Sequence, residues 1–208
     1  MNTDQLFSNN EFHGFEIQTH RGKLNEVHLS KMLDILQTCQ REYLETFCIR
    51  TDLHLPDGYI PLDNHVIERF IASLRAKLNH SESMREKKGI RVHTNKVRFI
   101  WCREISQTGR HHYHVLLMLN KQAYAHLGLF DRNCNNLYNR ICDAWSSAIA
   151  LSTSATAGLV HFPDNSTMFL RRDCQKSLSD VFFRVSYFAK HDTKPVGQNF
   201  HTLGTSRG

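Results

Sequence analysis

The stretch Gly109-Arg110-His111-His112-Tyr113-His114-Val115-Leu116-Leu117-Met118-Leu119 decides the fold of this chain. It opens at a glycine suited to a tight turn and continues into an apolar run typical of a buried β-strand. Residues two apart in a strand point to the same face of a sheet. The stretch therefore predicts a strand from which His112 and His114 project side by side.

A second strand candidate comes directly before this stretch, from Val97 to Ile105, and is rich in β-branched and aromatic residues. The simplest hairpin pairs Ser106 with Arg110 and leaves three loop residues. Gly109 then takes the left-handed conformation that such loops require. The two segments therefore predict an antiparallel hairpin.

The register of this hairpin decides whether a carboxylate joins the two histidines. The simplest register places Glu104 opposite His112, and a shift by two residues places it opposite His114. Both keep the three side chains on one face, whereas a shift by one residue removes Glu104 from that face. His-x-His pairs on strands are commonly plain surface residues, so Glu104 is what favours a metal site. Two imidazoles and a carboxylate suit a divalent cation, and we expect magnesium or manganese, with zinc as a further option.

The rest of the chain predicts an α+β fold with a largely antiparallel central sheet flanked by helices. Apolar spacing predicts helices over 29–46, with Ser30 as a candidate N-cap, from Asp63 or Asn64 to Leu78, over 121–129, over 134–149, and from the capping box Ser177–Asp180 to a stop at Pro195. Further strands are expected over 48–55, 157–162 and 167–171, the last two flanking the turn Pro163-Asp164-Asn165. The connections are too short for parallel pairs. We expect a loose N-terminal arm (1–28), one domain (29–195) and an unstructured C-terminal tail (196–208).

The strand over 48–55 alternates between apolar and polar residues. Arg50, Asp52 and His54 share its polar face, opposite Ile49 and Leu53. This polar face either lines a site or faces solvent, and the sequence leaves both options open.

Composition narrows the class of protein. The chain has 208 residues, a net charge of +6 and six cysteines, and a basic balance favours polyanions only weakly. No apolar run reaches the roughly 18 residues that span a membrane, and the N-terminus lacks the pattern of a secretory signal. No Cys-x-x-Cys pair occurs, so we expect reduced thiols in a cytoplasmic protein.

A second motif, Tyr187-Phe188-Ala189-Lys190, lies in the last predicted helix. Tyr187 falls off the apolar stripe of that helix, and Lys190 follows one turn later, so both can address one ligand. A phenol has a pKa near 10 and is a poor nucleophile unless it is activated. Tyr-x-x-Lys is common on helices, so the motif indicates a function only together with the His-x-His strand and Glu104.

The combination resembles the HUH endonucleases, which include rolling-circle replication initiators and relaxases. It consists of a His-hydrophobic-His strand with Tyr113 in the middle, an acid eight residues upstream, and a later Tyr-x-x-Lys helix. The amino-acid sequence around both motifs, from His112 to Leu117 and from Val185 to Lys190, is similar to that of inovirus gene-II-type replication proteins, including the YagK/YfjJ C-terminal-domain proteins. The resemblance covers residues 45–195 and implies an HUH nuclease fold.

The resemblance implies roles residue by residue. His112, His114 and Glu104 would hold the divalent metal, although the third ligand varies among these enzymes. Tyr187 would attack the scissile phosphate of single-stranded DNA, leaving a 5′-phosphotyrosine link and a free 3′-hydroxyl, and Lys190 would position the phosphate.

The same resemblance implies the partners. These are single-stranded or hairpin origin DNA, a host helicase and a host polymerase, and no membrane. A single catalytic tyrosine leaves open a homodimer for the termination step. The residues expected to contact DNA are basic, namely Arg50, Arg98, Arg110, Arg184 and Lys194.

Two other functions fit parts of the pattern. One is a non-catalytic DNA-binding protein on the same fold. The other is a histidine-triad nucleotide hydrolase, which would require a histidine where Leu116 stands. The complete set of His, His, Glu, Tyr and Lys favours the nuclease over both.

Overall fold

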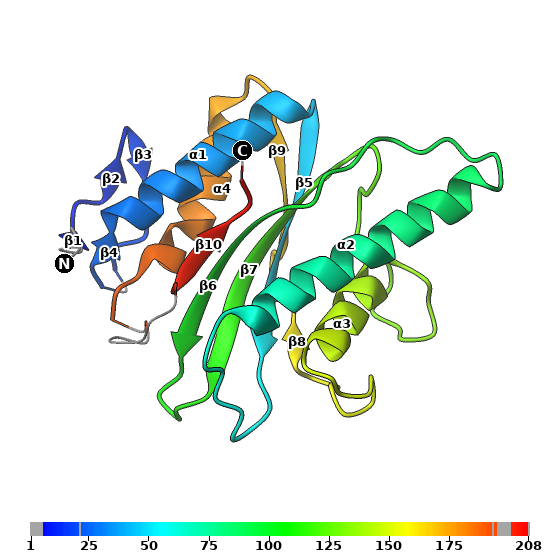
Figure 1. The fold of residues 1–208 in the computed structure, drawn as a ribbon. Helices are drawn as coiled ribbons and strands as arrows, with labels where there is room; N and C mark the ends of the chain where they lie inside the picture. The colour runs from blue at the N-terminus through cyan, green and yellow to red at the C-terminus, as the bar shows by residue number, and fades with distance from the viewer. Residues whose placement is uncertain (1–5, 21, 193, 195–200, 208) are drawn as a thin grey trace.

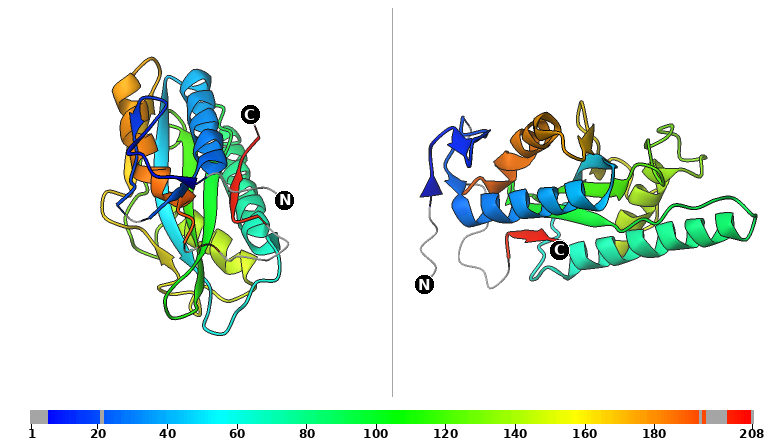
Figure 2. Two further views of the ribbon diagram at one scale, coloured as in Figure 1. Left: turned by 90° about the vertical axis from the view of Figure 1, so that its left-hand side faces the viewer. Right: turned by 90° about the horizontal axis from the view of Figure 1, so that it is seen from above.

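An antiparallel sheet separates two pairs of helices in the computed structural model, which describes residues 6–20, 22–192, 194 and 201–207 (Figure 1). Helices α1 (Glu26–Glu42) and α4 (Gln175–Ser186) cover one face. Helices α2 (His65–Glu86) and α3 (Leu137–Ala148) cover the other. The view from above in Figure 2 shows these layers. The fold is therefore the expected α+β arrangement of helices around an antiparallel sheet.

Within the described residues the sheet has the strand order β10-β6-β7-β5, and β5 carries both β8 and β9 along its outer edge. The bounds of its strands are β5 (Glu45–His54), β6 (Arg98–Ile105), β7 (His111–Asn120), β8 (Val160–His161), β9 (Thr167–Arg171) and β10 (Leu203–Thr205). Every pairing between these strands is antiparallel. β5 and β7 lie in the middle of the sheet.

The β6–β7 hairpin has the simplest of the expected registers. The Ser106 N–H donates to the Arg110 carbonyl over 2.9 Å, and Gly109 has a φ of 78°. Glu104 lies directly opposite His112. The pairing shifted by one residue is thereby excluded, and Glu104, His112 and His114 share the face covered by α1 and α4.

Strand alternation divides the core in two. On the face of α1 and α4 the strands contribute apolar side chains without aromatic rings, including Cys48, Ile100, Cys102, Leu116 and Met118. On the face of α2 and α3 they contribute both aromatic and aliphatic ones, including Phe47, Ile49, Leu53, Trp101, Tyr113, Val115 and Leu117. The apolar run of β7 is buried on both faces, which explains why it reads as continuous.

Several helix ends differ from those expected. α1 begins at Glu26 because the Asn25 side chain accepts from the His28 N–H, so Ser30 is not its cap. α4 begins at Gln175 and ends at Ser186, well before Pro195. The chain continues as the 3₁₀ turn η1 (Tyr187–Ala189). A local hydrogen bond thus overrode the sequence signal at the start of α1.

The helix expected over Lys121–Leu129 does not form. The Asn120 side chain accepts from the Gln122 N–H over 3.0 Å, which makes a turn instead. Further along, the Leu127 carbonyl accepts from the Tyr138 N–H over 2.9 Å. The expected start of α3 at Cys134 is also wrong, because Asn136 caps the helix.

β8 and β9 flank the turn at Asp164 and Asn165 as expected, but in the described sheet they do not pair with each other across it. Both pair with β5, at Asp52–His161 and at Ile49–Thr167, so they lie end to end along one edge. The residues between them bulge out, and the Arg50 N–H donates to the Ser166 carbonyl over 2.7 Å within this stretch. β8 is shorter than expected because residues 157–159 form a turn.

The N-terminal arm is packed, contrary to the expectation of a loose segment. It forms two short antiparallel pairs, β1 (Leu6–Phe7) with β4 (Leu24–Asn25) and β2 (Glu11–Phe12) with β3 (Phe15–Glu16). Phe12, Phe15, Ile17 and Leu24 are buried in the core beside α4. Such short strands leave no period for sequence patterns to detect.

The C-terminal tail is also partly ordered. Its residues 196–200 and 208 lie outside the described residues, but β10 pairs with β6 as an edge strand. A Cβ on Gly204 would lie 2.5 Å from the Trp101 ring, so the strand fits there only because this residue is glycine. The expectation of an unstructured tail is therefore wrong over 203–205.

Two composition-based expectations can be compared with the described residues. All six cysteines are free thiols, four of them buried. None of the helices in the described ranges is long and apolar enough to cross a membrane.

Candidate functional site

A cluster of side chains that could hold a metal ion lies at the end of the β6–β7 hairpin. Glu104, His112 and His114 each offer one ligand atom, and these atoms all lie within 4.8 Å of one another. The two Nε2 atoms are 3.2 Å apart, and His114 Nε2 is 3.6 Å from a Glu104 carboxylate oxygen. Three ligand atoms from two strands thus converge on one point.

Asp52 on β5 fixes the orientation of one imidazole. It lies opposite His114 in the sheet, and its Oδ1 is 2.7 Å from His114 Nδ1. This contact occupies Nδ1 and turns Nε2 towards His112 and Glu104. A carboxylate behind a histidine is a common outer partner in metal sites.

The protonation states follow from this packing. Burial, together with the smaller effect of the neighbouring His114 charge, lowers the pKa of His112 to about 4. Burial also acts to lower the pKa of His114, but hydrogen bonds to Asp52 and Glu104 outweigh it and raise that pKa. Burial acts to raise the pKa of Glu104, but His114 and the Lys194 ammonium hold it well below its usual range. At neutral pH the cluster therefore offers an ionised carboxylate and a neutral His112.

This arrangement fits a divalent cation. Neighbouring ligand atoms around a small divalent ion lie about 3 Å apart, since each is about 2.1 Å from the metal. The separation of the two Nε2 atoms, 3.2 Å, matches this value without rearrangement. The donor set, two imidazole nitrogens and a carboxylate oxygen, is one that manganese, zinc or magnesium accepts.

Tyr187 lies beside this cluster. The η1 turn carries it onto the face of the sheet, where its ring centroid is 5.2 Å from that of His114. Its side chain is buried, with 7% exposure. Burial raises the pKa of the phenol strongly, and the Arg50 charge opposes this only in part. The phenol is therefore protonated in the structure as it stands.

Arg50 connects the tyrosine to the sheet. Its guanidinium donates to the Tyr187 hydroxyl over 2.5 Å, lies 4.7 Å from the ring centroid, and is 3.6 Å from Asp52. The polar face of β5 thus lines the site. The sequence left open whether this face lines a site or faces solvent. Because β7 lies beside β5, the face lines the site.

The two lysines lie differently from what the motif suggested. Lys190 ends the η1 turn, and its side chain lies over Gly22 of the N-terminal arm, with its Cε 3.6 Å from where a Cβ on Gly22 would be. Lys194 instead donates to Glu104 over 3.1 Å, with 7% exposure on each side chain. Among the described residues, Lys194 is therefore the lysine that contacts the cluster.

The remaining arginines expected to contact DNA fall in three different places. Arg98 lies outside the site: it is buried under the end of α1 and makes two hydrogen bonds to Glu42, at 3.0 and 3.2 Å. This geometry removes Arg98 from the expected DNA contacts. Arg110 is exposed in the hairpin turn and pairs with Asp57. Arg184 donates to the Asp164 carbonyl over 2.5 Å in the bulge between β8 and β9.

Three further residues lie near the site, of which only His54 was grouped with a possible site from the sequence. His54 stacks on His112, with ring centroids 5.5 Å apart. His161 of β8 lies 3.8 Å from Asp52, and Phe188 stacks on His114 at 5.8 Å. His54 lies on the polar face of β5 and was detectable by alternation. His161 was not, because its pairing with β5 is a tertiary feature.

Comparison with known proteins places the chain in a family. Residues 7–206 match the model of the YagK/YfjJ C-terminal domain. The chain is 32% identical over 207 residues to a protein of Escherichia coli strain K12 described as uncharacterized protein YagK, with 94% of this chain and 95% of that protein covered. It is 31% identical over 196 residues to uncharacterized protein YfjJ of the same strain, covering 88% of this chain and 94% of that protein.

No solved structure matches the chain. The family match covers nearly the whole sequence, including the N-terminal arm and β10, which the motifs alone did not reach. The chain belongs to the YagK/YfjJ C-terminal domain family.

Proposed function

We propose that this protein is a metal-dependent HUH endonuclease that nicks and rejoins single-stranded DNA through Tyr187, as in the initiation of rolling-circle replication. The observation that carries the proposal is the position of a phenol ring 5.2 Å from the His114 ring of a convergent His, His, Glu cluster. A nucleophile and a cation site this close can act on one phosphate.

The reaction is a transesterification. The Tyr187 oxygen attacks the scissile phosphorus and forms a new O–P bond while the bond from phosphorus to the 3′-oxygen breaks. The phenol proton is released to solvent, and the departing 3′-oxygen takes up a proton. The products are a 5′-phosphotyrosine link and a free 3′-hydroxyl, and the reverse reaction rejoins the strand.

The residues of the chain have separate roles in this step. Glu104, His112 and His114 would hold magnesium or manganese, which when bound supplies positive charge to a non-bridging phosphoryl oxygen. Arg50 holds the Tyr187 hydroxyl in the DNA-free protein. When DNA binds, the phosphate competes for this guanidinium and frees the phenol, which favours attack. Lys194, which contacts Glu104, supplies positive charge near the phosphate, and Lys190 would need to turn away from Gly22 to do the same.

The substrate, the partner proteins and the location that we propose follow from the same resemblance to the HUH endonucleases. The substrate is single-stranded or hairpin origin DNA in the cytoplasm, with a host helicase and polymerase extending the free 3′-hydroxyl. The single tyrosine in the motif favours a second subunit for the termination step.

One observation favours a second function, non-catalytic DNA binding. Tyr187 is 7% exposed and its hydroxyl is already engaged by Arg50. A protein that only binds DNA has no need to release this phenol. The two functions differ in one product, the covalent adduct.

The decisive experiment looks for that adduct. The protein is incubated with labelled single-stranded hairpin DNA and manganese and is then run on a denaturing gel. We expect a covalent band with the natural chain and none with Tyr187→Phe, which removes only the hydroxyl. Tyr138→Phe, on α3 at the opposite face of the sheet, is the matched control and keeps the band. DNA binding without any band in the natural chain would establish the second function.

A further inference from the structure

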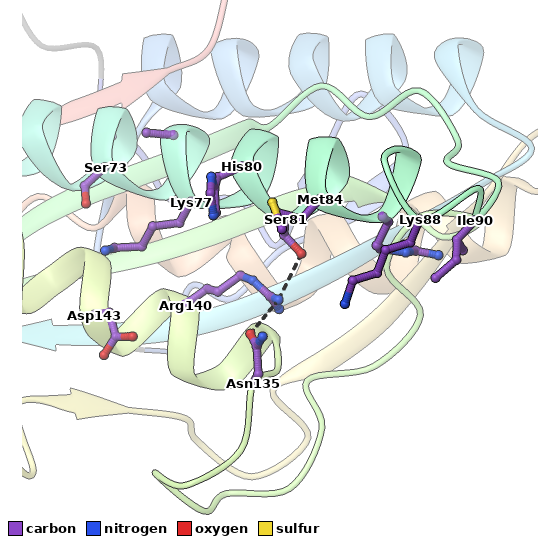
Figure 3. A pocket seen from close by; sticks show the side chains of 12 residues that line it. Ser73, Lys77, His80, Ser81, Met84, Lys88, Ile90, Asn135, Arg140 and Asp143 are labelled. Atoms are coloured by element: carbon purple, nitrogen blue, oxygen red, sulfur yellow. Dashed lines mark hydrogen bonds between the residues drawn. The ribbon is translucent and has the colours of Figure 1, made fainter.

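A groove lies between α2 and α3, on the face of the sheet opposite Tyr187. Its volume is about 720 Å³, and Figure 3 shows the side chains that line it. The α2 side runs from Ser73 to Arg85 and continues after the helix to Lys88 and Ile90, and the α3 side comes from Arg140, Asp143 and the preceding Asn135.

The charge of this groove is strongly one-sided. Lys77, Arg85, Lys88 and Arg140 line it, against the single carboxylate of Asp143. That carboxylate is already paired with Arg132 at 2.5 Å. The groove is therefore a concentration of positive charge with little internal compensation, and such a site attracts anions.

The Arg140 guanidinium is fixed in the middle of the groove by two hydrogen bonds. It donates to the Ser81 hydroxyl over 2.9 Å and to the Asn135 side-chain oxygen over 2.8 Å, as the dashed lines in Figure 3 mark. Both partners are neutral, so they orient the guanidinium without cancelling its charge. An arginine fixed in this way is suited to a phosphate oxygen.

The end of α2 adds two more side chains. The Gly89 N–H donates to the Glu86 carbonyl and the Ile90 N–H returns to the Arg85 carbonyl over 3.0 Å, so the chain folds back at the helix end. Gly89 has a φ of 72°, which a glycine adopts without strain. This turn brings Lys88 and Ile90 to the groove.

We infer that this groove binds the sugar-phosphate backbone of double-stranded DNA. Its lining combines lysine and arginine with serine and asparagine, which are the side chains that contact phosphate oxygens and sugars without reading sequence. Lys77 and Arg85 are eight residues apart on α2, about 12 Å along the helix, and Lys88 follows in the turn after the helix. One strand of a duplex presents about three to four phosphates over that length.

The position of the groove gives this contact a role. Tyr187 acts on a single strand at the α1 and α4 face, whereas the groove lies on the α2 and α3 face. A hairpin origin has both parts, so its duplex stem can occupy the groove while its unpaired segment reaches the tyrosine. The identity of the DNA as an origin rests on the proposed function, but the duplex contact itself does not.

The test measures duplex binding without any nicking. Fluorescence anisotropy with a labelled 20-base-pair duplex is recorded at several salt concentrations for the natural chain and for K77Q/R85Q/K88Q. Loss of three phosphate contacts should weaken binding about tenfold or more and reduce the slope of log affinity against log salt by about 2 to 3. Circular dichroism checks that the variant is folded.

A matched variant separates the groove from general charge. K31Q/R172Q/K176Q removes the same three charges from exposed positions on the α1 and α4 side. Equal losses in both variants would overturn the inference, as would the absence of duplex binding by the natural chain at 50 mM salt or equal competition by polyglutamate. Weakened binding of the duplex by the groove variant, with single-strand adduct formation unchanged, supports it. If adduct formation fails in the natural chain, the proposed function fails while the duplex measurement stands.

Discussion

At the scale of residues, the site depends on side chains that sequence motifs do not include. Asp52 lies on a strand distant in sequence, yet it is 2.7 Å from His114 and decides which imidazole nitrogen faces the cluster. The proposed metal ligands lie on one hairpin, where His112 and His114 are two residues apart and Glu104 lies opposite His112. The motif thus supplies the ligands, and the neighbouring strand orients them.

Removing Asp52 should weaken metal binding without removing a ligand. We expect Asp52→Ala to reduce manganese affinity about 10- to 100-fold, because His114 loses the partner that fixes its orientation. Isothermal titration calorimetry with manganese measures this directly. Asp57→Ala removes an exposed carboxylate in a nearby loop and is the control. An unchanged affinity in Asp52→Ala would show that His114 does not need this partner.

At the scale of elements, the N-terminal arm controls where α4 ends. The Gln18 N–H donates to Ser186 Oγ over 2.9 Å, and the Gln18 side chain donates to the Phe183 carbonyl over 2.8 Å. Beyond the tyrosine, the His191 N–H donates to the Lys23 carbonyl over 3.0 Å. The arm therefore binds the chain on both sides of Tyr187 and holds the η1 turn on the sheet.

Removing the Gln18 side-chain hydrogen bond should slow adduct formation more than it lowers the free energy of unfolding. We expect Gln18→Ala to cost about 1 kcal/mol of unfolding free energy and to slow adduct formation several-fold, because Tyr187 is then held less firmly. Metal affinity should stay the same, since the ligands lie on the hairpin. Adduct rates on denaturing gels, thermal melts and calorimetry separate the three effects. Gln122→Ala, in the turn after β7, is the control, and a loss of metal affinity in Gln18→Ala would contradict this assignment.

At the scale of the whole molecule, the sheet keeps two ligand surfaces apart. The cation cluster and Tyr187 lie on the face of α1 and α4, and the basic groove lies between α2 and α3. No side chain of the groove contributes to the cluster. The two surfaces should therefore respond independently to metal.

Chelation separates the two surfaces in one experiment. We expect excess EDTA to abolish covalent adduct formation and to leave duplex anisotropy unchanged, because the groove uses only lysine and arginine charge. Adding back manganese in excess over EDTA should restore the adduct. Duplex affinity that falls with chelation would contradict the separation, and an adduct that persists in EDTA would remove the metal from the reaction.

The sequence by itself determined the hairpin and the pattern on its two faces. Strand alternation and the Gly109 turn are local properties, so they predicted that Glu104 shares a face with His112 and His114 and, in the simplest register, lies opposite His112, as it does. Alternation along β5 likewise grouped Arg50, Asp52 and His54. The helices α2 and α3 were predicted from apolar spacing because each buries a long stripe.

Only the tertiary structure decided what surrounds that hairpin. β5 lies beside β7 and places Asp52 behind His114, the packed arm ends α4 at Ser186, and Arg98 turns away from the site to Glu42. None of these contacts leaves a local period or spacing in the chain, because each joins segments at least 50 residues apart. Local chemistry thus specified the ligands, and long-range packing specified their orientation and the position of Tyr187.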